Sequence, residues 1–129
     1  MTLLLDTHVL LWLDAEPERL SQVAAAAVSG ADELAVASVT WYELAWLAHA
    51  NRVVANTPIR SWLAELSRDI RSVGVTPAIA ATAAGLQPPF PGDPADRIIY
   101  ATAIEQGWQV VTKDRRMHDH PQPRTVAIW

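Results

Sequence analysis

Cysteine is absent from this 129-residue chain, and no run of apolar residues is long. The lack of cysteine excludes a disulfide scaffold and thiolate metal sites, and it fits a reducing compartment. No segment approaches the ~20 apolar residues that a membrane span needs. The opening segment, MTLLLDTHVLLWLD, has no basic leader and is interrupted by Asp6 and His8, so it does not resemble a signal peptide. We therefore expect a cytoplasmic protein that does not associate with membranes.

Positive charge is also scarce, because ten basic residues are outnumbered by fourteen acidic ones and the net charge is −4. A protein that wraps nucleic acid by bulk electrostatics usually has a basic domain, so the composition argues against that class. The same balance still permits an enzyme whose acidic pocket handles a phosphodiester through metal ions.

The length suits one domain with a substantial core, and we assign residues 1–129 to a single domain. Half of the residues are hydrophobic and 19% are charged, as in globular proteins. Strands are expected at 2–5, 34–38, 71–75, 108–112 and 125–129, and helices at 7–13, 21–28, 40–50, 59–70, 77–85 and 95–106. This alternation predicts the α/β class, with a central parallel sheet of about five strands flanked by helices.

Acidic residues recur near the ends of the expected strands and in the early turns of expected helices. The four that concern us are Asp6, Glu43, Asp96 and Asp114. In open parallel sheets, ligands bind beyond the carboxyl ends of the strands, where the strand order reverses. If the first strand is central and the second and fourth lie beside it, these acids converge on one rim of the sheet.

Each acid also has a purely structural interpretation. Asp6 can cap the helix that starts at Thr7, and TWYE matches a capping box in which Thr40 is the cap and Glu43 reaches back. In PGDPADR (91–97), an Asp before Pro94 and an acid in the first turn are typical of a helix start. Asp114 can be a turn residue. Caps would be scattered over the surface, however, whereas the arrangement expected here is convergent.

Convergence has an electrostatic consequence. Carboxylates a few ångströms apart in a partly buried crevice repel one another, and some must protonate unless a cation is bound. Oxygen ligands without cysteine or an obvious histidine set favour Mg²⁺ or Mn²⁺ over zinc. Such ions polarise a phosphoryl oxygen and activate water, so the chemistry that follows is phosphodiester hydrolysis.

Four sequence blocks, in this order, resemble a known family. LLLDTHVLLWL, SVTWYELAWL, GDPADRIIYATA and VVTKDRRM are similar to blocks of PIN-domain ribonucleases of the VapC type, the toxins of type II toxin–antitoxin pairs. The resemblance covers essentially the whole chain. It implies a three-layer PIN-like fold and an endoribonuclease that depends on Mg²⁺ or Mn²⁺. It also implies a homodimer that a cognate VapB-type antitoxin holds inactive.

The family's functional residues carry over by position. The resemblance implies that four acids bind the metal and serve catalysis: Asp6, Glu43, Asp96 and Asp114. The acid helix of this branch usually follows a motif like HxDPFDR, and here Pro91 and Ala95 replace the His and Phe. Asp93 is retained, and we interpret it as a helix cap or an outer ligand.

Several neighbours have candidate supporting roles. Thr7 and Thr112 lie beside acids and can orient ligands or a metal-bound water, or simply cap and turn the chain. Four basic residues are candidate contacts to RNA phosphates, or cations that neutralise the acids: Arg97, Lys113, Arg115 and Arg116. The HDH stretch at 118–120 is expected to be an exposed loop rather than a metal site. Core packing is expected for most of the tryptophans, including the helical Trp12, Trp46 and Trp62, with the alternative that one or two of them line a dimer face or an antitoxin groove.

Two other classes of function stay open at this stage. A phosphatase or phosphoacceptor domain would use Asp6 as a nucleophile. The phosphatase version expects a second acid two residues later, but His8 occupies that position. The other alternative is a non-catalytic α/β binding module in which the acids are only caps.

Overall fold

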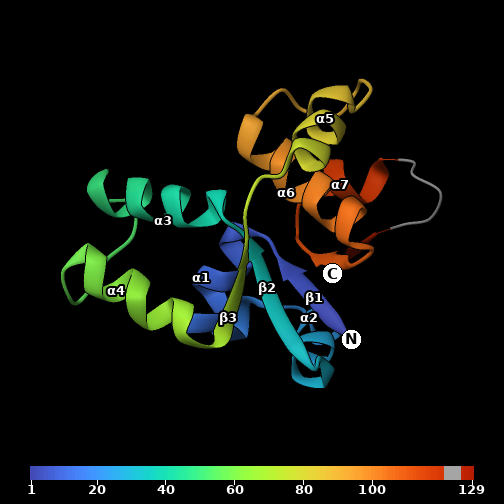
Figure 1. The fold of residues 1–129 in the computed structure, drawn as a ribbon. Coiled ribbons are helices and arrows are strands. Elements are labelled where there is room, and N and C mark those ends of the chain that lie inside the picture. Colours follow the sequence, from blue (N-terminus) through green and yellow to red (C-terminus); the bar gives the residue numbers. More distant parts are fainter. Residues whose placement is uncertain (121–125) are drawn as a thin grey trace.

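The computed structural model describes residues 1–120 and 126–129 as a twisted sheet covered by helices on both faces (Figure 1). The strands are β1 Thr2–Leu5, β2 Glu33–Ala37, β3 Ile70–Val73, β4 Gln109–Val111 and β5 Ala127–Ile128. All of their pairings are parallel, and the order is β3-β2-β1-β4-β5. The first strand is therefore central, with β2 and β4 beside it. The strand order reverses between β1 and β4, where an open α/β sheet places its ligand crevice.

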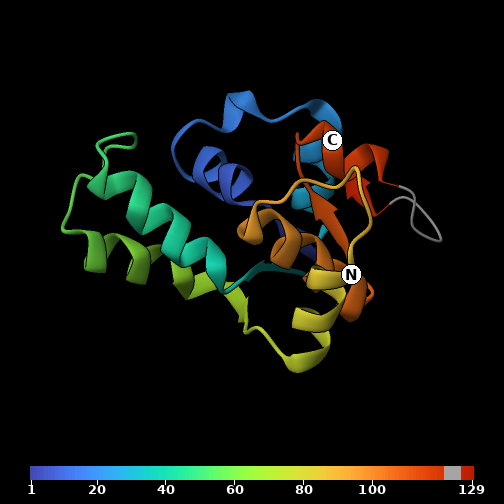
Figure 2. The same ribbon diagram turned by 90° about the horizontal axis from the view of Figure 1, so that it is seen from above.

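The helices form the outer two layers. They are α1 Thr7–Ala15, α2 Gln22–Gly30, α3 Val39–His49, α4 Ile59–Leu66, α5 Pro77–Gly85, α6 Pro94–Gln106 and α7 Arg115–Asp119, with 3₁₀ turns η1 Pro17–Arg19 and η2 Ser67–Asp69. The pair formed by α3 and α4 extends away from the sheet in both ribbon views (Figures 1 and 2). The expected three-layer α/β architecture is confirmed.

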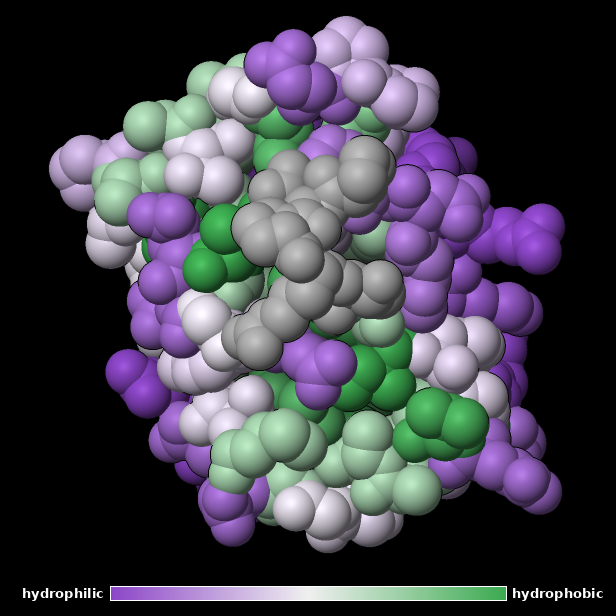
Figure 3. Space-filling view, turned by 90° about the vertical axis from the view of Figure 1, so that its right-hand side faces the viewer, coloured by the Kyte–Doolittle hydropathy of each residue, from purple (hydrophilic) through white to green (hydrophobic). Residues whose placement is uncertain are grey.

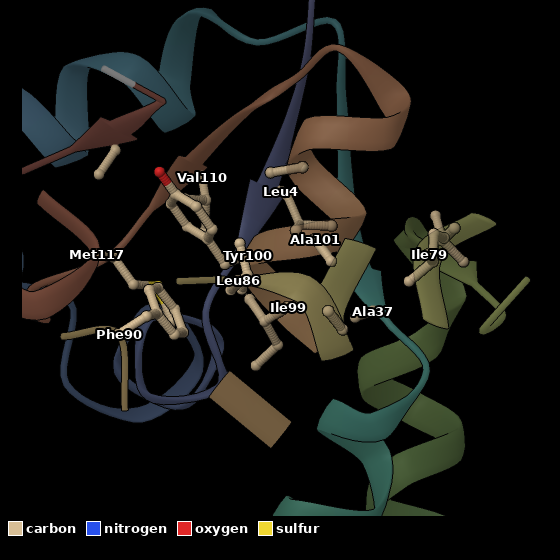
Figure 4. Close-up of a cluster of buried hydrophobic side chains, with 14 of the residues drawn as sticks. Leu4, Ala37, Ile79, Leu86, Phe90, Ile99, Tyr100, Ala101, Val110 and Met117 are labelled. Carbon is tan, nitrogen blue, oxygen red and sulfur yellow. The ribbon is translucent and has the colours of Figure 1, made fainter. Parts of the chain in front are cut away.

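Alternation along the strands divides the core into two parts. Leu4 packs with α5 and α6 on one face, whereas Leu3 and Leu5 pack with α1 and α2 on the other. Successive side chains of a strand point to opposite faces, so a strand buried on both sides must be apolar throughout. Figure 4 shows the first part, in which Leu4 lies among side chains of α5, α6 and β4.

Most expected elements are found within a residue or two of their predicted ends, but one helix is shorter. The apolar repeat from Ile59 to Ile70 predicted a continuous helix, whereas α4 ends at Leu66 and Ser67–Asp69 forms a 3₁₀ turn. The reason is that Ile70 has to pair with Leu34 in the sheet. In the closing strand, Thr125 lies outside the described residues.

The expectation that HDH forms an exposed loop is wrong. His118 and Asp119 belong to α7, and His120 is buried with its ring edge-on to Phe90 and Tyr100. The motif is therefore part of the core boundary rather than an exposed loop.

The tryptophans differ among themselves. Trp62 is buried as expected and Trp12 is half-buried, but Trp46 is 48% exposed. Trp46 belongs to α3, which projects beyond the sheet (Figure 1), and its side chain lines a cleft together with Glu43.

The surface on the α7 side mixes hydrophobic patches with margins of hydrophilic side chains (Figure 3). Among residues 1–120 and 126–129, no helix has both the length and the apolar content required to cross a bilayer.

Replacement of Leu4 by alanine tests the core. Leu4 is fully buried in the central strand, so we expect Leu4→Ala to lower the free energy of unfolding by about 2–5 kcal/mol. Urea denaturation measures this loss. The control Val54→Ala, at a side chain that is 85% exposed, should change stability by less than about 0.5 kcal/mol. Equal losses in the two variants would contradict the assigned core.

Candidate active site

The Asp6 carboxylate lies at the carboxyl end of β1, at the point where the strand order reverses. Its backbone N–H donates to Val111 O at 3.0 Å and so ties the end of β1 to β4. Its side chain is held on both oxygens: Oδ1 accepts from the Thr7 N–H at 2.7 Å, and Oδ2 accepts from the Thr112 hydroxyl at 2.6 Å. Asp6 is thus the N-cap of α1 and a fixed, buried carboxylate at once.

Thr112 links this acid to the next one. Its hydroxyl donates to Asp6 and accepts from the Asp114 N–H at 3.0 Å. Asp114 caps α7 by accepting from the Arg116 N–H at 2.9 Å. Thr7 and Thr112 therefore both hydrogen-bond to acids, and Asp114 is the cap of α7.

Glu43 reaches the same crevice from α3. The Thr7 hydroxyl donates to Glu43 Oε1 and lies 3.0 Å from the hydroxyl of Thr40, which must donate in turn. The expected capping box is wrong, because Ser38 occupies the N-cap of α3 and makes no side-chain cap bond. Thr40 instead hydrogen-bonds to Thr7, and Thr7 in turn hydrogen-bonds to Glu43.

Asp96 completes the group from the first turn of α6. Burial, as the largest cause, and the negative charges of Asp93, Asp6 and Asp114 together raise its pKa to about 7, against the opposing effect of Arg116. Burial also raises the pKa of Glu43, with added effects from Asp6 and Asp93, although the Thr7 hydrogen bond opposes them. The acids from different strand ends thus act on one another electrostatically, as the convergence argument required.

Asp93 has the structural role that we favoured. It is the N-cap of α6, with Oδ1 accepting from the Ala95 N–H at 2.8 Å, and its carboxylate is exposed. Its charge still acts on Asp96 and Glu43.

Arg116 is the cation that neutralises this crevice. It donates to Asp114 through Nε at 3.0 Å and Nη2 at 2.8 Å, and Nη2 lies 3.3 Å from Asp96 Oδ2. These bonds are the main reason that the pKa of Asp114 is lowered. Lys113 and Arg115 are exposed beside it.

Arg97 is placed differently from the expectation that it contacts RNA or neutralises the acids. Its guanidinium donates to the backbone carbonyls of Ala83, Ala84, Leu86 and Pro91 at 2.7–3.3 Å. The fork thereby ties the loop before α6 to the end of α5. Its role is to support the loop that carries Asp93.

His8 belongs to the site although the sequence argument gave it no role there. Its Nδ1 lies 3.5 Å from Asp6 Oδ2, and Nε2 accepts from the Lys113 N–H at 3.1 Å. Burial lowers its pKa despite the nearby carboxylates, so the neutral imidazole is favoured. Its position two residues after Asp6, on the first turn of α1, is the signal that could have found it.

The donor set fits a hard divalent cation. In the part of the chain that the structure describes, no three carboxylate or imidazole groups are arranged to hold a metal ion as they stand. Arg116 forms ion pairs with two of the acids, Asp96 and Asp114. Oxygen ligands in a crevice that raises carboxylate pKa values are the chemistry that Mg²⁺ or Mn²⁺ favours.

Comparison with known proteins agrees with this geometry. Residues 3–122 match the PIN domain family. The chain is 57% identical over 128 residues, 99% of its length and 98% of the relative's, to "Ribonuclease VapC22" of Mycobacterium tuberculosis. This chain therefore belongs to the PIN-domain family, as a ribonuclease of the VapC type, the toxin class of toxin–antitoxin systems.

Solved structures share the fold at low sequence identity. VapBC2 of Rickettsia felis, bound to a promoter DNA fragment, matches with a TM-score of 0.67 and 15% identity over 94% of both chains. VapBC-1 of nontypeable Haemophilus influenzae gives a TM-score of 0.67 and 18% identity over 92% of this chain and 94% of the other. PIN ribonucleases are typically metal-dependent, which agrees with the donor set.

The raised pKa of Asp96 gives the metal-free protein a defined pH dependence. The folded protein holds this proton more tightly than the unfolded chain, so its contribution to stability falls as pH rises from the usual pKa of 3.8 to about 7. Asp96→Asn should therefore melt above the wild type at pH 8 and close to it at pH 4. Thermal melts in EDTA measure the difference. A variant no more stable than the wild type at pH 8 would contradict the assigned crowding.

Proposed function

We propose that this chain hydrolyses RNA phosphodiester bonds internally, with Mg²⁺ or Mn²⁺ held by Asp6, Glu43, Asp96 and Asp114. The observation that supports this most is that acids from the ends of β1 and β4 and from α3 and α6 lie around one crevice. There the pKa of Asp96 is raised to about 7 partly by the other carboxylates. A divalent cation relieves this repulsion.

The chain's own residues prepare the reaction. Thr7 and Thr112 fix both oxygens of Asp6, so this ligand needs no reordering before it binds a cation. Glu43 has a raised pKa and is held at Oε1 by Thr7, which suits it to accept a proton from the attacking water. The metal, when bound, polarises the phosphoryl oxygen and lowers the pKa of that water.

Positive residues on the α7 side suit the RNA backbone. Arg116 pairs with Asp96 and Asp114 and would be available to a phosphate if these acids held a metal ion, and the exposed Lys113 and Arg115 lie on the same segment. Beside Glu43, a cleft of about 430 Å³ opens between α3 and the start of α6. RNA can approach the acids along this cleft.

The biological setting follows from the same family. The structural neighbours are toxin–antitoxin complexes, and we propose that this chain likewise forms a homodimer and is inhibited by a VapB-type antitoxin. Its site of action is the cytoplasm, where the RNA substrates are.

The alternatives explain less of the geometry. An Asp6 nucleophile would need an accessible oxygen, but Asp6 is 4% exposed and both of its oxygens accept hydrogen bonds. A module with acids serving only as caps accounts for Asp6, Asp93 and Asp114. It does not account for Glu43 and Asp96, which cap nothing yet lie in the same crevice.

Asp6→Asn tests the proposal directly. Loss of this central ligand should reduce Mg²⁺-dependent RNA cleavage by more than about 100-fold, and Thr112→Val, which removes its support, by about 10–100-fold. Cleavage of a labelled RNA, with thermal melts to confirm folding, measures both losses.

Asp69→Asn is the matched control, because Asp69 is an exposed acid before β3, at the other edge of the sheet. It should cleave at the wild-type rate. Full activity in Asp6→Asn, with contaminating nuclease excluded, would overturn the assignment.

A further inference from the structure

Two basic side chains from distant segments meet on the ring of Trp12. The Arg19 guanidinium carbon lies 4.3 Å from the ring centroid, and Lys113 Nζ lies 5.9 Å from it. Arg19 ends the 3₁₀ turn after α1, and Lys113 follows β4, so only the fold brings them together. Both cations are exposed, whereas the ring beneath them is half-buried. We call these three side chains the Trp12 cluster.

The Trp12 cluster adjoins the acidic crevice. The Trp12 ring packs against His8, with centroids 4.8 Å apart, and His8 Nδ1 lies 3.5 Å from Asp6 Oδ2. The Lys113 N–H binds the other ring nitrogen of His8. Trp129 packs against both rings, with its centroid 5.9 Å from that of Trp12 and 6.4 Å from that of His8, and fixes Trp12 further. One imidazole thus separates the cluster from the central carboxylate.

The position of these cations matters because the chain is acidic as a whole. With a net charge of −4, it lacks the general attraction for a polyanion that a basic domain would supply. Cations held on an aromatic face keep their charge, and the contact reduces the freedom they lose on binding a phosphate. Arginine stacked in this way also offers a planar surface for a base and a fork of donors for phosphate oxygens.

We propose that Arg19 and Lys113, held by Trp12, bind backbone phosphates of single-stranded RNA next to the bond that is cut. Trp12 is a positioning residue, since it acts through the two cations. This inference rests on the proposed function and extends it, because it names the residues that hold the strand beside the acids. The Glu16 carboxylate, 3.1 Å from Arg19 Nη1, is the partner that phosphate replaces.

Arg71 supplies a matched control. Its guanidinium lies over Trp108 at 5.3 Å and 3.2 Å from a Glu33 oxygen, and its side chain is 53% exposed, as is that of Arg19. It therefore repeats the chemistry of Arg19. It lies in β3 near the amino-terminal edge of the sheet, away from the crevice.

The test measures binding apart from cleavage. A labelled single-stranded oligoribonucleotide of mixed sequence is titrated with the Asp96→Asn protein in EDTA, at several salt concentrations. Adding Arg19→Gln or Lys113→Gln should each weaken binding about three- to tenfold and reduce the salt slope by about 0.7, as expected for one lost phosphate contact. Arg71→Gln should change neither quantity. With Asp96 intact, Arg19→Gln should raise KM for RNA and leave kcat close to the wild type.

Variants at Trp12 separate positioning from packing. Trp12→Phe keeps an aromatic face and should retain most of the RNA affinity, whereas Trp12→Leu keeps apolar bulk alone and should bind like Arg19→Gln. Thermal melts confirm that both variants fold. Equal RNA affinity in Trp12→Leu and Trp12→Phe would show that the ring only packs, which overturns its positioning role.

Two further results would overturn the proposal that Arg19 and Lys113 bind RNA. If Arg19→Gln and Lys113→Gln bind RNA as tightly as Arg71→Gln, the proposal is wrong even where Asp6→Asn has lost cleavage. If their weaker binding accompanies dissociation of a dimer in sedimentation, the surface is a protein interface and the proposal is also wrong. Persistent cleavage in Asp6→Asn would instead overturn the proposed catalytic role of Asp6 and leave the binding result standing.

Discussion

The arrangement of the site depends on how Asp6 is held at the end of the central strand. Its backbone joins β1 to β4, and its two carboxylate oxygens accept from Thr7 and Thr112. Each threonine also binds a second acid. The Thr7 hydroxyl donates to Glu43, and the Thr112 hydroxyl accepts from the backbone N–H of Asp114. A buried charge is tolerated only where its hydrogen bonds are made. This network supplies the hydrogen bonds of Asp6 and also brings two further acids, Glu43 and Asp114, close to it.

Crowding of the acids is the feature from which function follows. The fold brings helix N-termini to the same rim as the strand ends, and their free N–H groups stabilise Asp6, Asp93 and Asp114 as caps. Capping and metal binding are therefore compatible uses of one residue. Asp96 caps no helix, and its burial together with the charges of Asp93, Asp6 and Asp114 raises its pKa.

Much of this could be predicted from sequence because it depends on local pattern. Apolar runs gave the strands, and acids at their ends gave Asp6, Glu43, Asp96 and Asp114. The roles of Thr40 and Arg97 could not be predicted, since each depends on a contact with a distant segment. Thr40 bonds a residue in α1, and Arg97 bonds the end of α5. Likewise, only the tertiary fold reveals that α3 leaves Trp46 exposed while Trp12 gathers cations.

The central claim is that these carboxylates form one cation site, and calorimetric titration with Mn²⁺ in two buffers of different ionisation enthalpy tests it most directly. Metal binding must displace the proton that Asp96 holds, since ligands bind in their deprotonated form. The account predicts binding that releases more protons at pH 6 than at pH 8.5, with both binding and release lost in Asp6→Asn. Absence of binding in the wild type, or binding without proton release at pH 6, would contradict it.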